Sequence, residues 1–286
     1  MSDQAPRTAE VQSADRRKGP AFTEMLSIFL KQDYRFPVLE IFAFLFSMGI
    51  LISTSSLQGY NTTYLAYSYL GTGGAIGLPI LVFMILIWKN VSFGLGGDLE
   101  KGLMQTFLAY PLSRRRLLGA RLLSSVGVAL GILSLAELVV LLIMMPGFAS
   151  QQASTLLLNY LSVLATPILI TMIVLLVCVL VKSSGVPLLI GIVTYFFAGL
   201  FLNLFVGLAE QTKDAALLGF TYLLNPAIAF QSYYNYNFNG GSTGFFNSTL
   251  GIPGFESTMA YLVGNYAISV ILLAVSAFWF ARKLEL

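Results

Sequence analysis

The 286-residue sequence contains no histidine and one cysteine, Cys178. An internal disulfide is therefore impossible, and a metal site built from histidines or several cysteines is excluded by count. A Ser–His intramembrane protease is excluded for the same reason. The P-loop pattern G-x-x-x-x-G-K-[ST] is also missing, so we expect that the chain is not an enzyme and does not itself hydrolyse ATP by that route. No basic patch alternates with aromatics in a polar segment, which argues against a nucleic-acid partner.

Acidic residues are scarce in the apolar segments. The aspartates, which all lie outside these segments, are Asp3, Asp15, Asp33, Asp98 and Asp214. This placement argues against an aspartyl intramembrane protease. Glu137 is the one carboxylate well inside an apolar segment, and buried ionisable groups in membranes are functional candidates by default. We therefore predict Glu137 as part of a substrate path or gate, with satisfaction by partial solvation or a neighbouring helix as the alternative.

Long apolar runs dominate what is present. Hydrophobic residues make up 57% of the chain and charged residues only 10%, against about 25% charged residues in a typical soluble domain. Since a helix needs roughly 20 apolar residues to cross the hydrocarbon core, we predict an all-α polytopic membrane protein with six transmembrane helices. The predicted spans are residues 37–57, 70–88, 122–145, 155–181, 186–208 and 259–281.

Basic residues follow these spans asymmetrically. Of the 16 Lys and Arg residues, all except Lys213 fall on one side of the predicted six-span topology. Basic flanking segments stay cytoplasmic, so both termini are predicted inside. Five or seven spans would break this partition.

The flanking segments complete the predicted organisation. We expect residues 1–20 to form a disordered cytoplasmic tail and residues 21–286 a single transmembrane domain. Residues 21–32 have helical spacing of apolar side chains and are predicted as an interfacial helix, the alternative being an extension of the next helix. Between spans five and six, the chain to about Tyr234 is predicted to form short outer-interface helices. Asn61 and Asn247 begin acceptor sequons that would face outward.

The most informative segment joins spans two and three in a predicted basic loop, residues 89–121. Gly94, Gly96 and Gly97 indicate a flexible exit from span two, followed by an acidic start and a short helix-compatible stretch that stops at Pro111. Ser113 can cap the helix that follows. A short helix held between two spans would act as a lever on both.

This segment resembles the cytoplasmic loop of type-2 ATP-binding-cassette (ABC) transporter permeases. In that family an acidic residue and Gly-Thr precede an apolar stretch, followed by Pro-x-Ser-Arg and Leu-Leu-x-Gly-Lys. The matching residues are Glu100, Gly102, Leu108, Pro111, Ser113, Arg114, Leu117, Leu118 and Gly119. Leu103 replaces the family's Thr, and Arg121 replaces its Lys. The resemblance extends more weakly to the six spans, the N-terminal helix and Leu224-Asn225-Pro226.

The resemblance implies the membrane-spanning permease subunit of an ATP-driven exporter in the cytoplasmic membrane of a prokaryote. The expected partners are a second permease copy, identical or related, and separate ATPase subunits that bind ATP and Mg²⁺. The loop would be a coupling helix that docks on the ATPase. The implied coupling residues are Glu100, Gly102, Pro111, Ser113, Arg114 and Arg115. For the arginines, anchoring on the positive side of the membrane is an equal alternative.

Two other functions remain open at this stage. An ion-coupled secondary transporter or channel would need several polar groups near the bilayer midplane and often an internal repeat, and the sequence offers one carboxylate and no convincing repeat. A non-transporting membrane subunit for assembly or sensing is also compatible with six spans. The transported substrate is not specified by these residues.

Overall fold

The computed structural model of the protein describes residues 22–35, 37–55, 77–103, 113–144, 146–151, 153–238 and 252–283. Helices account for nearly all of these residues, and no strand occurs among them. The all-α prediction is therefore confirmed for the described part of the chain. The predicted tail, residues 1–20, lies outside it, as do both sequons.

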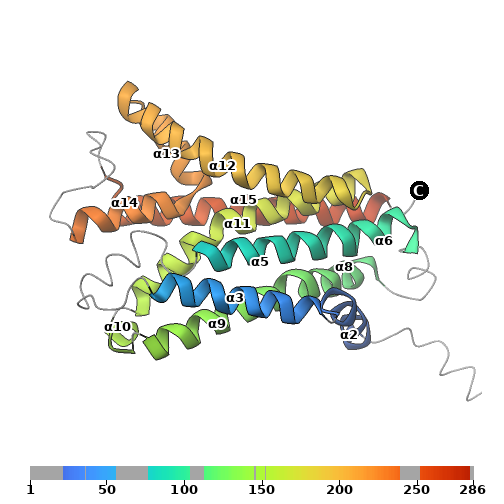
Figure 1. Cartoon of the computed structure of the whole chain (residues 1–286). Helices are drawn as coiled ribbons and strands as arrows, with labels where there is room; N and C mark the ends of the chain where they lie inside the picture. Colours follow the sequence, from blue (N-terminus) through green and yellow to red (C-terminus); the bar gives the residue numbers. More distant parts are fainter. Residues whose placement is uncertain are drawn as a thin grey trace, which may run out of the picture.

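Five stretches of the described chain are helical, long and apolar enough to cross a membrane, as expected of a multi-pass membrane protein. They are Ile80–Glu100, Arg114–Val139, Ala153–Val181, Gly185–Thr212 and Phe255–Arg282. Figure 1 shows the long helices running lengthwise beside one another. The predicted first span falls on helix α3 (Val38–Ser55), where the apolar stretch is shorter, Glu40–Gly49.

The second long helix continues well beyond the predicted end of its span. Helix α5 (Gly77–Lys89) passes into the π-helical segment η2 (Asn90–Gly96) and then into α6 (Gly97–Glu100) without a break. The prediction that the chain leaves the helix at residue 88 and turns flexibly at its glycines is wrong. Two of these helical glycines, Gly94 and Gly96, lie against Arg121 and Ser183, which come from distant parts of the chain and which sequence spacing cannot reveal.

The third long helix begins earlier than predicted. It starts with α8 (Arg114–Leu122) and continues through the π-helical segment η3 (Leu123–Gly127) into α9 (Val128–Met144). The basic loop predicted over residues 89–121 is therefore too long at both ends, and only residues 101–113 separate α6 from α8. Charged residues alone did not mark a loop here, because two of them, Asp98 and Arg121, are buried between helices.

The later helices match their predictions more closely. Short α10 (Pro146–Gln151) leads to α11 (Ala153–Val181), and a turn at residues 182–184 leads to α12 (Gly185–Thr212). Helix α15 (Phe255–Lys283) occupies the predicted last span.

The short helices predicted between the last two spans are confirmed. They are α13 (Ala215–Leu224) and α14 (Pro226–Phe238), which fold back against α15, with α14 also against α11. Figure 1 shows them at the end of the bundle away from the C-terminus.

A separate helix crosses the bundle at the C-terminal end. Helix α2 (Phe22–Asp33) packs on α8 and η3, and Figure 1 shows it nearly end-on while the long helices run across the view. It matches the helix predicted over residues 21–32. Because it is not collinear with α3, it is not an extension of that helix.

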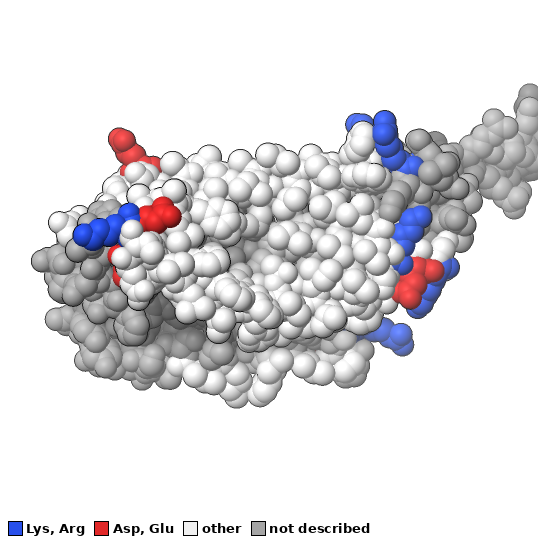
Figure 2. Space-filling view, turned by 90° about the horizontal axis from the view of Figure 1, so that it is seen from above, with Lys and Arg blue, Asp and Glu red and all other residues white. Residues whose placement is uncertain are grey.

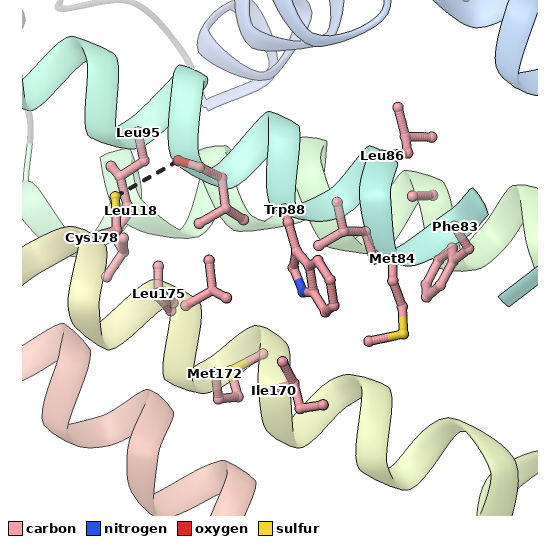
Figure 3. Close-up of a cluster of buried hydrophobic side chains, with 14 of the residues drawn as sticks. Phe83, Met84, Leu86, Trp88, Leu95, Leu118, Ile170, Met172, Leu175 and Cys178 are labelled. Atoms are coloured by element: carbon pink, nitrogen blue, oxygen red, sulfur yellow. Dashed lines mark hydrogen bonds between the residues drawn. The ribbon is translucent and has the colours of Figure 1, made fainter. Parts of the chain in front are cut away.

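The hydrophobic core lies between the second and fourth long helices. Figure 3 shows Trp88 and Met84 of α5 facing Met172 and Leu175 of α11. The indole Nε1 of Trp88 donates a hydrogen bond of 3.3 Å to the Thr171 hydroxyl. These two helices form the stable centre, whereas much of α12 and α15 faces outward.

Candidate functional site

Charged side chains gather at the ends of the bundle. Figure 2 shows basic side chains at one end, a small mixed group at the other, and an uncharged belt between them. At the basic end, the Arg114 guanidinium donates to the Ala281 carbonyl near the end of α15. Lys213 follows the last residue of α12, about 42 Å along that helix from its start at a rise of 1.5 Å per residue. The structure thus separates Lys213 from the basic end.

Glu100 ends the second long helix at the basic end. Its carboxylate is exposed, and Oε2 accepts a 2.9 Å hydrogen bond from the Ser184 backbone N–H in the turn between α11 and α12. Gly102, two residues further on, has φ of +69°. Glycine adopts this left-handed conformation without the strain a side chain would bring, which suits the end of a helix. Glu100 and Gly102 therefore set the direction in which the chain enters the 101–113 segment.

Ser113 and the arginines form the other side of this segment. The Ser113 side chain accepts a 3.4 Å hydrogen bond from the Arg116 N–H and caps α8, as predicted. Arg115 is exposed, whereas Arg114 is partly covered by its contact with α15. Pro111 and the predicted coupling helix fall within residues 104–112, outside the described residues. The structure thus brings the described residues among those predicted for coupling to one end of the bundle.

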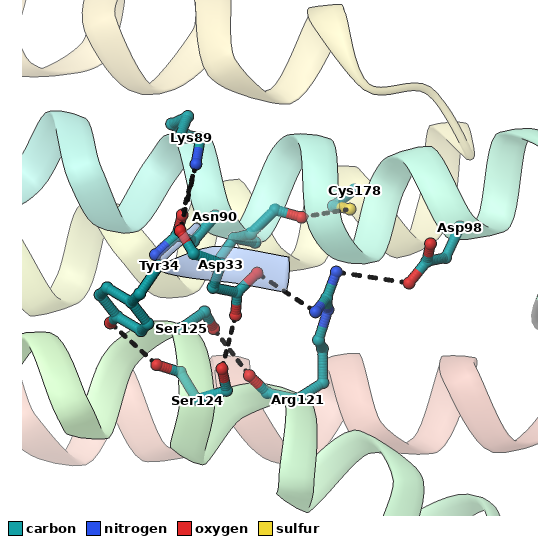
Figure 4. A network of polar contacts seen from close by, with 10 residues as sticks. Asp33, Tyr34, Lys89, Asn90, Asp98, Arg121, Ser124, Ser125 and Cys178 are labelled. Atoms are coloured by element: carbon teal, nitrogen blue, oxygen red, sulfur yellow. Dashed lines mark hydrogen bonds and ion pairs between the residues drawn. The ribbon is translucent and has the colours of Figure 1, made fainter. Parts of the chain in front are cut away.

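A buried ionic cluster joins the three helical elements next to this segment. The Arg121 guanidinium lies 3.2 Å from the Asp33 carboxylate of α2 and 3.3 Å from the Asp98 carboxylate of α6. All three residues are almost completely buried, and the Phe29 ring lies 4.7 Å from the guanidinium carbon. Figure 4 shows Arg121 between the two carboxylates. Since breaking a buried ion pair leaves an uncompensated charge, the cluster fixes α2, α6 and α8 relative to one another.

Further hydrogen bonds surround this cluster. The Ser124 hydroxyl donates to the Asp33 carboxylate at 2.6 Å, and the Tyr34 hydroxyl donates to the Ser124 carbonyl at 2.9 Å. The Lys89 ammonium donates to the Asp33 carbonyl at 3.3 Å. Helix α5, helix α2 with the turn after it, and η3 thus each contribute a polar partner.

Two glycines of η2 make room for these contacts. A Cβ at Gly94 would collide with the Arg121 guanidinium. At Gly96 a Cβ would lie 2.7 Å from the Ser183 carbonyl oxygen. The glycines are therefore sites of close approach, one to a charged side chain and one to the α11–α12 turn.

Burial shifts the proton affinity of the groups contributed by α2 and the turn after it. It raises the pKa of the Asp33 carboxyl, while the Arg121 guanidinium and the Ser124 hydroxyl oppose the rise. It also raises the pKa of the Tyr34 hydroxyl. The Asp33 carboxyl is thus held in place by its partners against a cost of desolvation.

Glu137 lies far from this end. It is buried in α9, about 24 Å along the helix from Arg121 at 1.5 Å per residue. One turn earlier, the Ser134 hydroxyl shares a 2.7 Å hydrogen bond with the Tyr160 hydroxyl of α11. The structure therefore does not join Glu137 to the predicted coupling residues.

Sequence reasoning missed the roles of Asp33 and Asp98. Both were placed outside the spans, but Asp98 lies within the span-length helical stretch Ile80–Glu100. That part of the prediction is wrong, because the second helix continues from the predicted end of its span at residue 88 to Glu100, about three further turns. The available signal was one arginine and two aspartates near predicted helices: Asp33 follows the helix over residues 21–32, Asp98 lies in the loop after span two, and Arg121 precedes span three.

Comparison with known proteins adds no relative. No family model, no curated protein and no solved structure matches this chain. Among the described residues, no group of three or more His, Cys, Asp or Glu side chains could hold a metal ion. In the described end of the bundle, a buried ionic cluster joins the adjacent ends of two long helices to α2.

Proposed function

We propose that the protein is the permease subunit of an ATP-driven ABC exporter, working as a dimer with separate ATPase subunits. In this proposal α3 is the first of six spans, the basic end is cytoplasmic, and the membrane is the cytoplasmic membrane of a prokaryote. The positive-inside rule supports this orientation. The resemblance of residues 100–121 to the permease loop supports the family.

The observation that carries the proposal is the rigid frame around residues 101–113. The segment connects two continuous long helices, Ile80–Glu100 and Arg114–Val139. The Asp33–Arg121–Asp98 cluster clamps these helices to α2. A force applied by an ATPase on this segment would therefore move both helices together, which is what coupling hydrolysis to alternating access requires.

Substitutions at Glu100 can separate a role in docking the ATPase from a role in the hydrogen bond to Ser184. The full-length chain is co-expressed and co-purified with the proteins encoded beside its gene, among which the proposal expects a P-loop ATPase, and nucleotide hydrolysis and vesicle transport are measured. Glu100→Lys reverses the exposed charge and should weaken the partner's affinity by about 10-fold, equivalent to about 1.4 kcal/mol, and uncouple hydrolysis from transport. Glu100→Gln keeps an acceptor for the Ser184 N–H, so its loss of coupling reports the missing charge alone.

Glu256 provides the matched control. It is an exposed acidic residue in the first turn of α15, at the other end of that helix from Arg282, so Glu256→Lys should leave coupling unchanged. If no P-loop protein co-purifies with the wild-type chain, or if Glu100→Lys couples normally, the proposal fails.

One observation favours a second candidate, an ion-coupled transporter. Glu137 is a carboxylate buried in a helix long enough to span a membrane, and such groups can carry protons or ions. Transport by the chain alone in vesicles, driven by a pH gradient without ATP and lost in Glu137→Gln, would support this candidate over the first.

A further inference from the structure

A cavity of about 830 Å³ lies between α11, α12 and α14, with Ile80 of α5 also in its wall. This volume falls within the roughly 300–1,000 Å³ typical of small-molecule sites. The lining is mostly apolar but includes five neutral polar residues, Thr166, Tyr195, Asn203, Asn225 and Gln231. No Lys, Arg, Asp or Glu occurs among the described residues that line it.

The cavity extends from mid-bundle away from the basic end. On α12, Tyr195 lies 10 residues and Asn203 18 residues after Gly185, or about 15 Å and 27 Å along the axis. Asn225 and Gln231 belong to the folded-back segment at the far end. The polar groups of the cavity thus lie between the middle of the bundle and the end opposite the basic end.

The lining retains hydrogen-bonding capacity. The Asn203 amide nitrogen donates to the Gly199 carbonyl at 2.7 Å, which leaves the amide oxygen as an acceptor. The Thr166 hydroxyl donates to the Leu224 carbonyl at 3.0 Å and can still accept. Pro167 has no N–H for the Val163 carbonyl, and both residues line the cavity. An acyl chain alone would leave such groups unsatisfied, at a cost.

The cavity borders the outward face of α12. Phe196, Leu200 and Leu204 line it and are 61%, 61% and 57% exposed. In a membrane this face meets lipid, so a ligand can enter sideways from the bilayer. A charged group brought in by this route would lose its hydration without gaining an ionic partner.

We propose that this cavity binds an uncharged amphipathic molecule, with an apolar body and a head rich in hydroxyl, carbonyl or amide groups, taken from the bilayer. The inference rests on the proposed function in treating this molecule as the exported substrate. Binding itself needs no ATPase, so it can be tested separately.

The test uses two photoreactive probes with the same alkyl chain and a chain-borne diazirine, a monoacylglycerol and an alkyl sulfate. The full-length chain is placed in phosphatidylcholine vesicles, illuminated with each probe and digested, and labelled peptides are quantified. The monoacylglycerol should label α11, α12 or α14 saturably and at least about 10-fold more than the sulfate, since only the sulfate carries a charge into the cavity.

Gly199 allows the cavity to be filled without a clash. It lines the cavity, and a Cβ added there meets no atom within 4 Å. Gly199→Leu should reduce saturable labelling at least about 10-fold. Gly207→Leu is the matched control, because Gly207 is on the same helix, is equally open and does not line the cavity. Asn203→Leu, which removes one acceptor at an exposed position, should reduce labelling about 5-fold.

The outcomes are decisive in either direction. Equal labelling by both probes, labelling that does not saturate, or labelling unchanged in Gly199→Leu and Asn203→Leu would show that only membrane lipid occupies the cavity, and would overturn the proposal. Failure here with coupling to an ATPase intact leaves the proposed function standing. Selective binding by a chain with which no P-loop ATPase co-purifies would support the cavity and refute the exporter.

Discussion

Arg121 links more helices at the basic end of the bundle than any residue that matches the permease-loop motif. Its guanidinium contacts carboxylates from α2 and α6, and its backbone carbonyl accepts a hydrogen bond from the Ser125 hydroxyl. In the sequence it stands where the resembled family has a lysine. A lysine could not reach both carboxylates with the planar fork of an arginine. Arg121 is important because it is buried between two carboxylates. Its spacing from Pro111 and Ser113 in the sequence does not show this.

The importance of the Arg121 ion pairs can be tested by adding a single methyl group at Gly94. Gly94→Ala should displace the Arg121 guanidinium and break its ion pairs, which we expect to destabilise the protein by about 1–3 kcal/mol. Gly97→Ala is the matched control, since Gly97 is helical and a Cβ there meets nothing within 4 Å. It should be neutral or stabilise by about 0.5–1 kcal/mol.

The measurement for this pair is the thermal unfolding midpoint in one detergent, where about 2–4 °C corresponds to 1 kcal/mol. Equal midpoints for the two alanine variants would contradict the role assigned to Gly94.

At the scale of elements, periodicity located the helices but not their ends. Apolar runs predicted α11, α12 and α15 within a few residues, because each of these helices is apolar along nearly its whole length. The extensions through Glu100 and from Arg114 were missed, since the pairing of Asp98 with Arg121 inside the bundle cannot be read from the sequence. The glycines of η2 were predicted to form a flexible turn, because the residues that pack against them, Arg121 and Ser183, come from distant parts of the chain.

Asp33 provides the ionic attachment of helix α2 to the bundle, beside the apolar contacts of Met25 and Phe29. Asp33→Ala removes the partner of Arg121 and Ser124, a loss of about 1.5–3 kcal/mol for a charge-assisted hydrogen bond. Amide hydrogen exchange in α2 should then accelerate about 10- to 100-fold. Because burial already raises the pKa of the Asp33 carboxyl, the neutral Asp33→Asn, which keeps an acceptor for Ser124, should accelerate it less than about 10-fold.

Lys31→Ala is the control for this series, as Lys31 is exposed in the last turn of the same helix. Its exchange rates should match those of the wild type. If Asp33→Ala also leaves them unchanged, the cluster does not hold α2.

At the scale of the whole molecule, charge placement and helix length agree. The long helices carry an uncharged belt between charged ends (Figure 2). Such a surface suits a protein that crosses a bilayer several times. The partition of basic residues was predictable from sequence because it needs only the order of apolar runs. The cavity was not, since its lining comes from α5, α11, α12 and α14 and no local pattern marks it.

The orientation of the chain can be tested with introduced cysteines, because the native Cys178 is 0% exposed and should not react. Arg115→Cys and Lys213→Cys are both exposed positions at opposite ends of the bundle. In intact cells a membrane-impermeant maleimide should label Lys213→Cys at least about 10-fold more than Arg115→Cys, because basic segments resist translocation. Permeabilised cells should show equal labelling, which serves as the control. The reverse pattern would place residues 101–113 outside the cell, out of reach of any ATP-hydrolysing partner, and the exporter proposal would fall with it.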